Sequence, residues 1–149
     1  MYIPDLAKYL PEWGEGEKEM NLIAVGWLDI DFPYPKGEIS IDAQDKLEQF
    51  CSNAMIRNFG VEFCSLCSKD EFVTVPLKFG KIIQLFGTYE IRIPSSDGKK
   101  VYAAPDFILH HVITHNYKPP QEFLDSLLIA PLPGTPEFEK FAEPWSQYR

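Results

Sequence analysis

The chain has 149 residues, with 14 basic and 22 acidic side chains, a formal net charge of −8 and a sequence pI of about 4.8. Hydrophobic residues make up 45% of it, which excludes a wholly disordered chain and allows a buried core. The acidity argues against binding of duplex nucleic acid, because such binding depends mainly on Lys and Arg contacts to phosphates. We therefore expect one domain, residues 1–149, that does not bind nucleic acid.

The acidic charge is concentrated at the two ends of the chain. Residues 1–56 hold 4 basic and 11 acidic side chains, residues 57–118 hold 8 and 6, and residues 119–149 hold 2 and 5. Such asymmetry serves solubility, and it also suits a surface that meets a basic partner. We expect a protein partner, of basic character, at an acidic terminal surface.

Neither a membrane span nor a disulfide framework is predicted. The longest apolar run, residues 22–28, is much shorter than the roughly 20 residues that a helix needs to cross a bilayer. The N-terminus has no basic region followed by an apolar one, as a secretory signal would have. Three cysteines make an odd number, which fits a reduced compartment. We expect a cytoplasmic protein without membrane contacts.

In the first half of the chain, residues 1–20 read as an acidic loop region and residues 22–28 as a buried strand. Two prolines and a glycine mark residues 31–37 as a turn region. Ser40 can cap a helix that runs to about Ile56, where residues 58–60 end it. The expected apolar face of this helix consists of Ile41, Leu47, Phe50, Ala54 and Met55.

In the second half, residues 72–75, 89–93 and 100–103 read as strands, and Asp97-Gly98 favours a hairpin turn between the last two. Pro105 suits the first turn of a helix to about His115, with Asn116 as a left-handed C-cap. A second short helix should run from Pro119-Pro120 to about residue 129, followed by an irregular proline-rich tail over 131–149. The pattern predicts an α+β fold, a single small domain with a short antiparallel sheet and about three helices.

One group of residues has the chemistry of a metal site. Cys64 and Cys67 form a Cys-x-x-Cys pair, and His110, His111 and His115 are all the histidines of the chain. Tetrahedral Zn²⁺ is bound by four N or S donors, and two thiolates from a turn plus two imidazoles from a helix supply them. The sequence predicts a structural zinc knuckle that staples a turn to a helix.

The Cys-x-x-Cys pair could instead be a redox pair, or have no function. A redox motif of the thioredoxin type opens a helix after a strand. Here the motif lies between Phe63 and the charged residues 69–71, which is typical of a turn. This context and the downstream histidines favour zinc.

The histidine spacing leaves two ligand pairs open. His111 and His115 are four residues apart and share a helix face. His110 and His115 are five apart and point about 140° from each other, so they converge only if the helix tightens or ends near His115. Spacing alone slightly favours His111 over His110.

Residues 103–112 and 115–123 resemble a family of small uncharacterised bacterial proteins. That family carries the pattern Y-A-A-P, then H-Y-V-x-x-H-x-Y-x-P-P-x-E-F, with an upstream Gly-x-His-x-Cys-x-x-Cys and a Trp-Leu-Asp near the start. The upstream motifs correspond to residues 60–67 and 27–29, so the resemblance spans most of residues 22–125. The family brings no established activity to this chain.

The resemblance implies a ligand set. In its register His110 and His115 match the family histidines, whereas His111 replaces a tyrosine and Glu62 stands where the family often has histidine. The predicted zinc ligands are therefore Cys64, Cys67, His110 and His115, with His111 as the alternative to His110.

Enzyme signatures are scarce. The sequence has no Walker A loop, no Gly-x-Gly-x-x-Gly, no Gly-x-Ser-x-Gly and no His-Glu-x-x-His, so no catalytic residue is assigned. The prediction is a zinc-stabilised acidic interaction protein, of which an immunity protein that covers a basic toxin is the concrete form. The alternative is a small zinc-dependent hydrolase-like enzyme with an open metal position and Glu62 or Glu90 as general base.

Overall fold

A computed structural model describes residues 1–10, 21–54, 56–57, 63–67, 73–76, 82–85 and 89–148. For residue 57, both strands between 73 and 85, and residues 147–148, only the backbone is described. Residues 11–20 of the predicted acidic loop region, Glu62 and the charged residues 69–71 lie outside the described residues.

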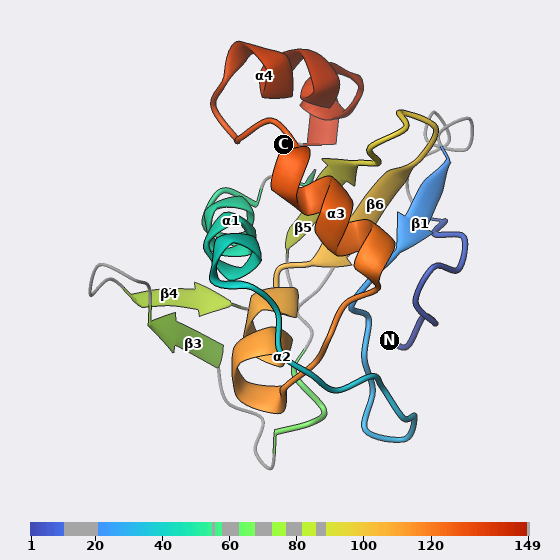
Figure 1. Ribbon diagram of the computed structural model, residues 1–149, viewed down its shortest axis with the longest axis vertical. Helices are drawn as coiled ribbons and strands as arrows, with labels where there is room; N and C mark the ends of the chain where they lie inside the picture. Colours follow the sequence, from blue (N-terminus) through green and yellow to red (C-terminus); the bar gives the residue numbers. More distant parts are fainter. Residues whose placement is uncertain are drawn as a thin grey trace.

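A four-stranded sheet, in the order β1-β6-β5-β2, forms the centre of the fold (Figure 1). Its strands are β1 (Leu22–Ala24), β2 (Ile56–Arg57), β5 (Tyr89–Pro94) and β6 (Val101–Pro105). A separate hairpin consists of β3 (Val73–Pro76) and β4 (Ile82–Leu85). The main sheet is mixed, because β1 runs parallel to β6 while the other pairs are antiparallel. The α+β domain is as predicted, but the predicted antiparallel sheet is corrected to a mixed one by the parallel β1–β6 pair.

Helices α1 (Ile41–Ser52) and α3 (Gln121–Ile129) pack against each other and both contact β5 (Figure 1). Helix α2 (Ile108–His115) follows directly after β6 and contacts α1 and β3. Between α1 and α3, Lys46 donates hydrogen bonds to the carbonyl oxygens of Leu128 and Ala130. The ammonium group thereby satisfies carbonyls at the end of α3, which has no basic residue in its own last turn. The result is a single α+β domain with one core.

The beginning of α1 is as predicted and its end is not. Ser40 caps the helix by accepting a hydrogen bond from the Ala43 N–H. The helix ends at Ser52 rather than near residue 56, because residues 56–57 pair with β5 as β2. Ile41 was assigned to the apolar face but is 76% exposed, whereas Leu47 and Phe50 are buried.

Strand β1 is shorter than the predicted apolar run because the backbone turns at Gly26. This residue has φ +81°, and a Cβ built on it would lie 2.9 Å from Cγ1 of Ile108. A side chain here would be strained by the backbone conformation and would also collide with α2. The close approach places the chain after β1 directly against the helix that carries the histidines. Trp27, the next residue, is buried as expected.

The hairpin between β5 and β6 turns at the predicted position, with Gly98 at φ +72°. Pro105 is the last residue of β6, not the first turn of a helix, and α2 begins at Ile108. Asn116 has φ 54° and ψ 31°, the left-handed C-cap that the sequence predicted. Helix α3 also runs to residue 129 as expected.

The C-terminal segment is helical, so the expectation of an irregular tail was wrong. Helix α4 (Pro136–Ala142) leads into a 3-10 helix, η2 (Glu143–Tyr148). Thr135 caps α4 and Pro136 occupies its first turn. Phe138 and Trp145 are buried, and burial of these side chains stabilises a segment whose prolines had suggested irregular structure.

The first ten residues lie along β1 rather than apart from the domain. The Leu6 and Tyr9 N–H groups donate to the carbonyl oxygens of Ala24 and Leu22, and the Ala24 N–H donates to Ala7. This edge of β1 is therefore paired and not open to another strand. Within the described residues, no helix has the length and apolar character needed to cross a bilayer.

Candidate metal centre

The Cys-x-x-Cys segment forms a tight turn fixed to the loop after β1. The Cys67 N–H donates to the Cys64 carbonyl oxygen over 3.3 Å, and Ser65 Oγ accepts a hydrogen bond from the Ile30 N–H over 3.0 Å. The backbone N–H groups of Leu66 and Cys67 also lie within hydrogen-bonding reach of the Cys64 sulfur. Donors aimed at the sulfur favour the thiolate, which is the form that binds metals.

Helix α2 supplies the two imidazoles from its last two turns. His115 is the final helical residue, and Asn116 then leaves the helix in its left-handed conformation. The Tyr34 hydroxyl donates to the His115 carbonyl oxygen over 2.9 Å, which holds this end of the helix. His110 and His115 thus meet at a helix end, the one place where a spacing of five residues allows it.

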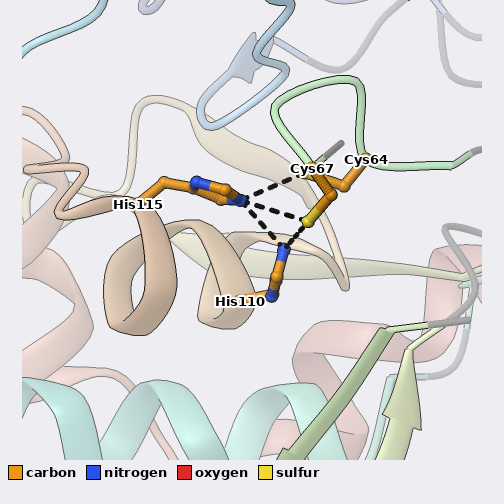
Figure 2. A group of neighbouring side chains, drawn as sticks. All are labelled: Cys64, Cys67, His110 and His115. Atoms are coloured by element: carbon orange, nitrogen blue, oxygen red, sulfur yellow. Dashed lines mark hydrogen bonds between the residues drawn. The ribbon is translucent and has the colours of Figure 1, made fainter. Parts of the chain in front are cut away.

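The four side chains point toward one another (Figure 2). The Cys67 sulfur lies 3.2 Å from Nε2 of His110 and 3.4 Å from Nε2 of His115. The Cys64 sulfur lies 3.5 Å from Nε2 of His115, and the two Nε2 atoms are 3.1 Å apart. All four donor atoms fall within 4.8 Å of one another. We call these residues the Cys2His2 cluster.

Four of the six separations between donor atoms are close to the edges of a tetrahedral zinc site. With Zn–S near 2.3 Å and Zn–N near 2.05 Å, tetrahedral angles place N and S about 3.6 Å apart and two N atoms about 3.4 Å apart. The four separations given above are slightly shorter than these values, and the other two pairs of donor atoms lie within 4.8 Å. The arrangement can hold a metal ion at its centre with little movement of the side chains.

Without a metal, burial keeps the two imidazoles in the neutral form that binds metals, but it keeps the Cys64 thiol protonated. Burial, together with the neighbouring His115, lowers the pKa of His110 to about 4, and burial lowers that of His115. Both imidazoles are therefore neutral near pH 7, as metal ligands must be. Burial raises the pKa of Cys64 to about 11. A bound cation would reverse that effect, because its charge stabilises the thiolate.

His111 does not join the cluster. Its side chain is 3% exposed, and burial together with the neighbouring His110 and His115 lowers its pKa to about 3. It forms part of the wall of a separate small hollow next to Gly26. The structure therefore places His110, and not its alternative His111, with the other three predicted ligands.

A family model, Domain of unknown function (DUF7919), matches residues 1–128. The chain belongs to the DUF7919 family. The match includes all four residues of the Cys2His2 cluster, whereas α4 and η2 lie beyond it. No curated protein and no solved structure matches the chain. The bacterial origin and the residue pattern expected from the resemblance are not tested by this match.

Glu62 and Glu90 are the general-base candidates of the hydrolase alternative in this DUF7919 domain. Glu62 lies outside the described residues. Glu90 is buried on β5, where it accepts hydrogen bonds from Arg92 over 2.8 and 3.2 Å and from the Tyr9 hydroxyl. It is not among the residues of the cluster. A carboxylate held in an ion pair in this way is poorly suited to accept a proton from water.

Sequence reasoning missed this buried polar group. We call Tyr9, Glu90, Arg92 and Trp145 the arginine cluster, since the Arg92 guanidinium lies 5.8 Å from the Tyr9 ring and 5.4 Å from the Trp145 ring. The available signal was the alternation of Glu90 and Arg92 with isoleucines on one strand. Alternation normally indicates a solvated polar face, but here the rings of Tyr9 and of Trp145 in η2 lie against the Arg92 guanidinium.

Proposed function

We propose that this DUF7919 protein is a zinc-stabilised interaction protein, in which the metal is structural and an acidic surface covers a basic protein partner. The observation that carries the metal assignment is the convergence of two sulfurs and two imidazole nitrogens at tetrahedral separations. Thiolate and imidazole together suit Zn²⁺ better than the oxygen-preferring Mg²⁺ or Ca²⁺.

A structural role follows from the number of donors. Four protein ligands fill a tetrahedral zinc, which leaves no position for a catalytic water. The cluster joins the turn after residue 63 to the end of α2, two segments far apart in the sequence. A metal at this point would hold the knuckle against the helix, as predicted for a zinc staple.

The support for a basic partner is the charge of the chain, −8 overall and concentrated toward its ends. Acidic surfaces accelerate association with basic ones and make it dependent on salt. A nuclease toxin neutralised by an immunity protein is one partner of this kind. The test is purification of the protein together with its partner. We expect a basic protein that co-purifies and is released by salt, and that no longer co-purifies when acidic residues between 12 and 31 are changed to Lys.

The metal assignment is tested by metal analysis of protein purified without added metal. We expect one zinc per chain, lost in Cys64→Ser and in His115→Ala. Cys51→Ala is the matched control, because Cys51 is a buried cysteine outside the cluster and its loss should leave the zinc in place. A folded wild-type protein without metal would contradict the assignment.

A further inference from the structure

The knuckle turn holds two sulfurs near enough to bond to each other. The Cys67 N–H donates to the Cys64 carbonyl oxygen over 3.3 Å, and residues 65–66 between them form the turn. In such a turn the first and fourth Cα atoms are less than about 7 Å apart, and a disulfide needs about 4.4–6.8 Å. The two sulfurs lie within 4.8 Å of each other, so side-chain rotation can bring them together without refolding of the turn.

The two thiols of the turn differ in their access to solvent. Cys67 is partly exposed, whereas Cys64 is buried and only 5% exposed. A small oxidant that arrives from solvent therefore meets the Cys67 sulfur first. Cys64 is then the nearby second thiol that converts an oxidised cysteine to a disulfide.

The third cysteine of the chain does not compete for this reaction. Cys51 lies on α1 in the hydrophobic core and is not part of the Cys2His2 cluster. Burial raises the pKa of the Cys51 thiol, which keeps it protonated and unreactive. Oxidation of the folded chain should therefore give one disulfide, between Cys64 and Cys67.

The oxidisable ligands all come from one of the two segments that the cluster joins. The turn supplies both sulfurs, and α2 supplies both imidazoles. The thiolate is the form of cysteine that binds metals, so one disulfide removes every ligand of the turn at once. The Ser65 hydroxyl also accepts the Ile30 N–H, so movement of the turn reaches the acidic loop after β1.

We propose that the Cys2His2 cluster is a redox switch, in which a peroxide oxidises Cys64 and Cys67 to a disulfide and the knuckle releases both the metal and α2. The inference rests on the proposed function, because it concerns the regulation of the same zinc site. It connects the oxidation state of the turn to the position of a loop on the acidic partner surface.

The reaction has two steps. The Cys67 thiolate attacks one oxygen of the peroxide, the O–O bond breaks, and Cys67 becomes a sulfenic acid while hydroxide leaves. The Cys64 thiolate then attacks the Cys67 sulfur, the S–O bond breaks, and a second hydroxide leaves. The two sulfurs lose two electrons in total, and hydrogen peroxide is reduced to two hydroxide ions, which take up protons from the solvent.

The test is treatment of the full-length, zinc-containing protein with excess hydrogen peroxide, followed by catalase. We expect release of one zinc per chain to a colorimetric chelator and a fall from three free thiols to one. Peptide mass mapping should find the Cys64–Cys67 disulfide, and the NMR signal of the Ile30 amide should shift. Dithiothreitol and zinc should restore the thiols and the metal, which separates this reaction from methionine oxidation, since dithiothreitol does not repair that damage.

Three variants assign the roles of the cysteines. Cys51→Ala is the matched control and should release zinc as the wild type does. Cys64→Ser and Cys67→Ser each lack one ligand, so they are compared with each other. Dimedone, which traps sulfenic acids, should label Cys64→Ser severalfold faster, because that variant keeps the exposed thiol. Faster labelling of Cys67→Ser would overturn the assignment of Cys67 as the attacking thiolate.

Three results would overturn the inference and leave the zinc site in place: zinc that stays bound with three thiols intact, oxidation to sulfinic acids without a disulfide, or a disulfide that includes Cys51. A protein that holds no metal before peroxide is added contradicts the proposed function, and the inference fails with it. Reversible zinc release from a protein that has no basic partner supports the switch and contradicts only the partner.

Discussion

Among the residues that the structure describes, the arginine cluster and the Cys2His2 cluster differ in whether the chain itself completes them. In the arginine cluster, the buried carboxylate of Glu90 meets the guanidinium of Arg92, so positive and negative charge are paired. In the Cys2His2 cluster, two thiols and two neutral imidazoles face one another without a positive charge. The first group is neutralised by its own residues, whereas the second has the donors of a cation site.

The comparison separates a structural ion pair from a ligand-binding arrangement on physical grounds. A buried salt bridge stabilises little by itself, but loss of one partner leaves an isolated buried charge. A set of electron-pair donors aimed at a common centre becomes favourable when a metal ion occupies it. Removal of the metal should therefore destabilise the Cys2His2 cluster and leave the arginine cluster unchanged. Removal of one charge of the ion pair should destabilise the arginine cluster and leave the metal bound.

The largest effect is expected from loss of a ligand in the Cys2His2 cluster. Cys67→Ser should lower the free energy of unfolding by roughly 5 kcal/mol, because the metal no longer joins the knuckle to α2. For a chain of this size the melting temperature would fall on the order of 15 °C. A chelator should lower the melting temperature of the wild type but not of the variant. Equal melting temperatures for wild type and variant, both containing zinc, would contradict the assignment of Cys67 as a ligand.

Removal of Arg92 should be the next most damaging change. Arg92→Met leaves Glu90 buried without its guanidinium partner, and such losses cost about 3–5 kcal/mol. Urea denaturation measures the effect, and the zinc content should stay at one per chain. The double variant Glu90→Gln/Arg92→Met should recover part of the loss, because no buried charge is then left unpaired. A cost below about 1 kcal/mol for Arg92→Met would show that the pair is not what holds this part of the core.

Acid should destabilise the metal-free protein through His111. The pKa of this imidazole is lowered from 6.5 in the unfolded chain to about 3 in the fold, mainly by burial. The folded state therefore binds fewer protons, so its stability is fully present above pH 6.5 and is lost as the pH falls toward 3. In His111→Gln, stability should depend less steeply on pH between 6.5 and 4. Identical slopes for wild type and variant would argue against a buried neutral His111.

The smallest effect concerns the end of α2. Asn116 holds a left-handed conformation, so Asn116→Ala should cost about 1 kcal/mol and Asn116→Gly should be close to neutral. Because this residue ends the helix directly after His115, Asn116→Ala should also weaken zinc binding, as measured by competition with a chelator. Unchanged affinity would mean that the cap does not position His115.

The sequence predicted those features that are determined locally. Ser40, Gly98 and Asn116 each favour a particular backbone conformation of their own, and each is found in the predicted place. The Cys-x-x-Cys pair and the histidines were singled out by side-chain chemistry, which does not depend on the fold. Whether the four ligand candidates meet in space could not be derived from these signals.

The predictions that failed depended on long-range contacts. Nothing in the run after Leu22 specifies a parallel pairing with β6, because strand direction is decided by distant partners. Helix α4 is stabilised by burial of Phe138 against the rest of the domain, which the proline-rich composition conceals. The choice between His110 and His111 depended on where α2 ends, and spacing alone had favoured the wrong neighbour for convergence with Cys67.

X-ray absorption at the zinc edge, on protein purified without added metal, is the most direct test of the central claim. The account predicts one zinc per chain with two sulfur neighbours near 2.3 Å and two nitrogen neighbours near 2.0–2.1 Å. It also predicts that His110→Ala changes this spectrum and that His111→Gln does not. Folded protein without zinc, or zinc held by a different set of neighbours in the wild type, would contradict it.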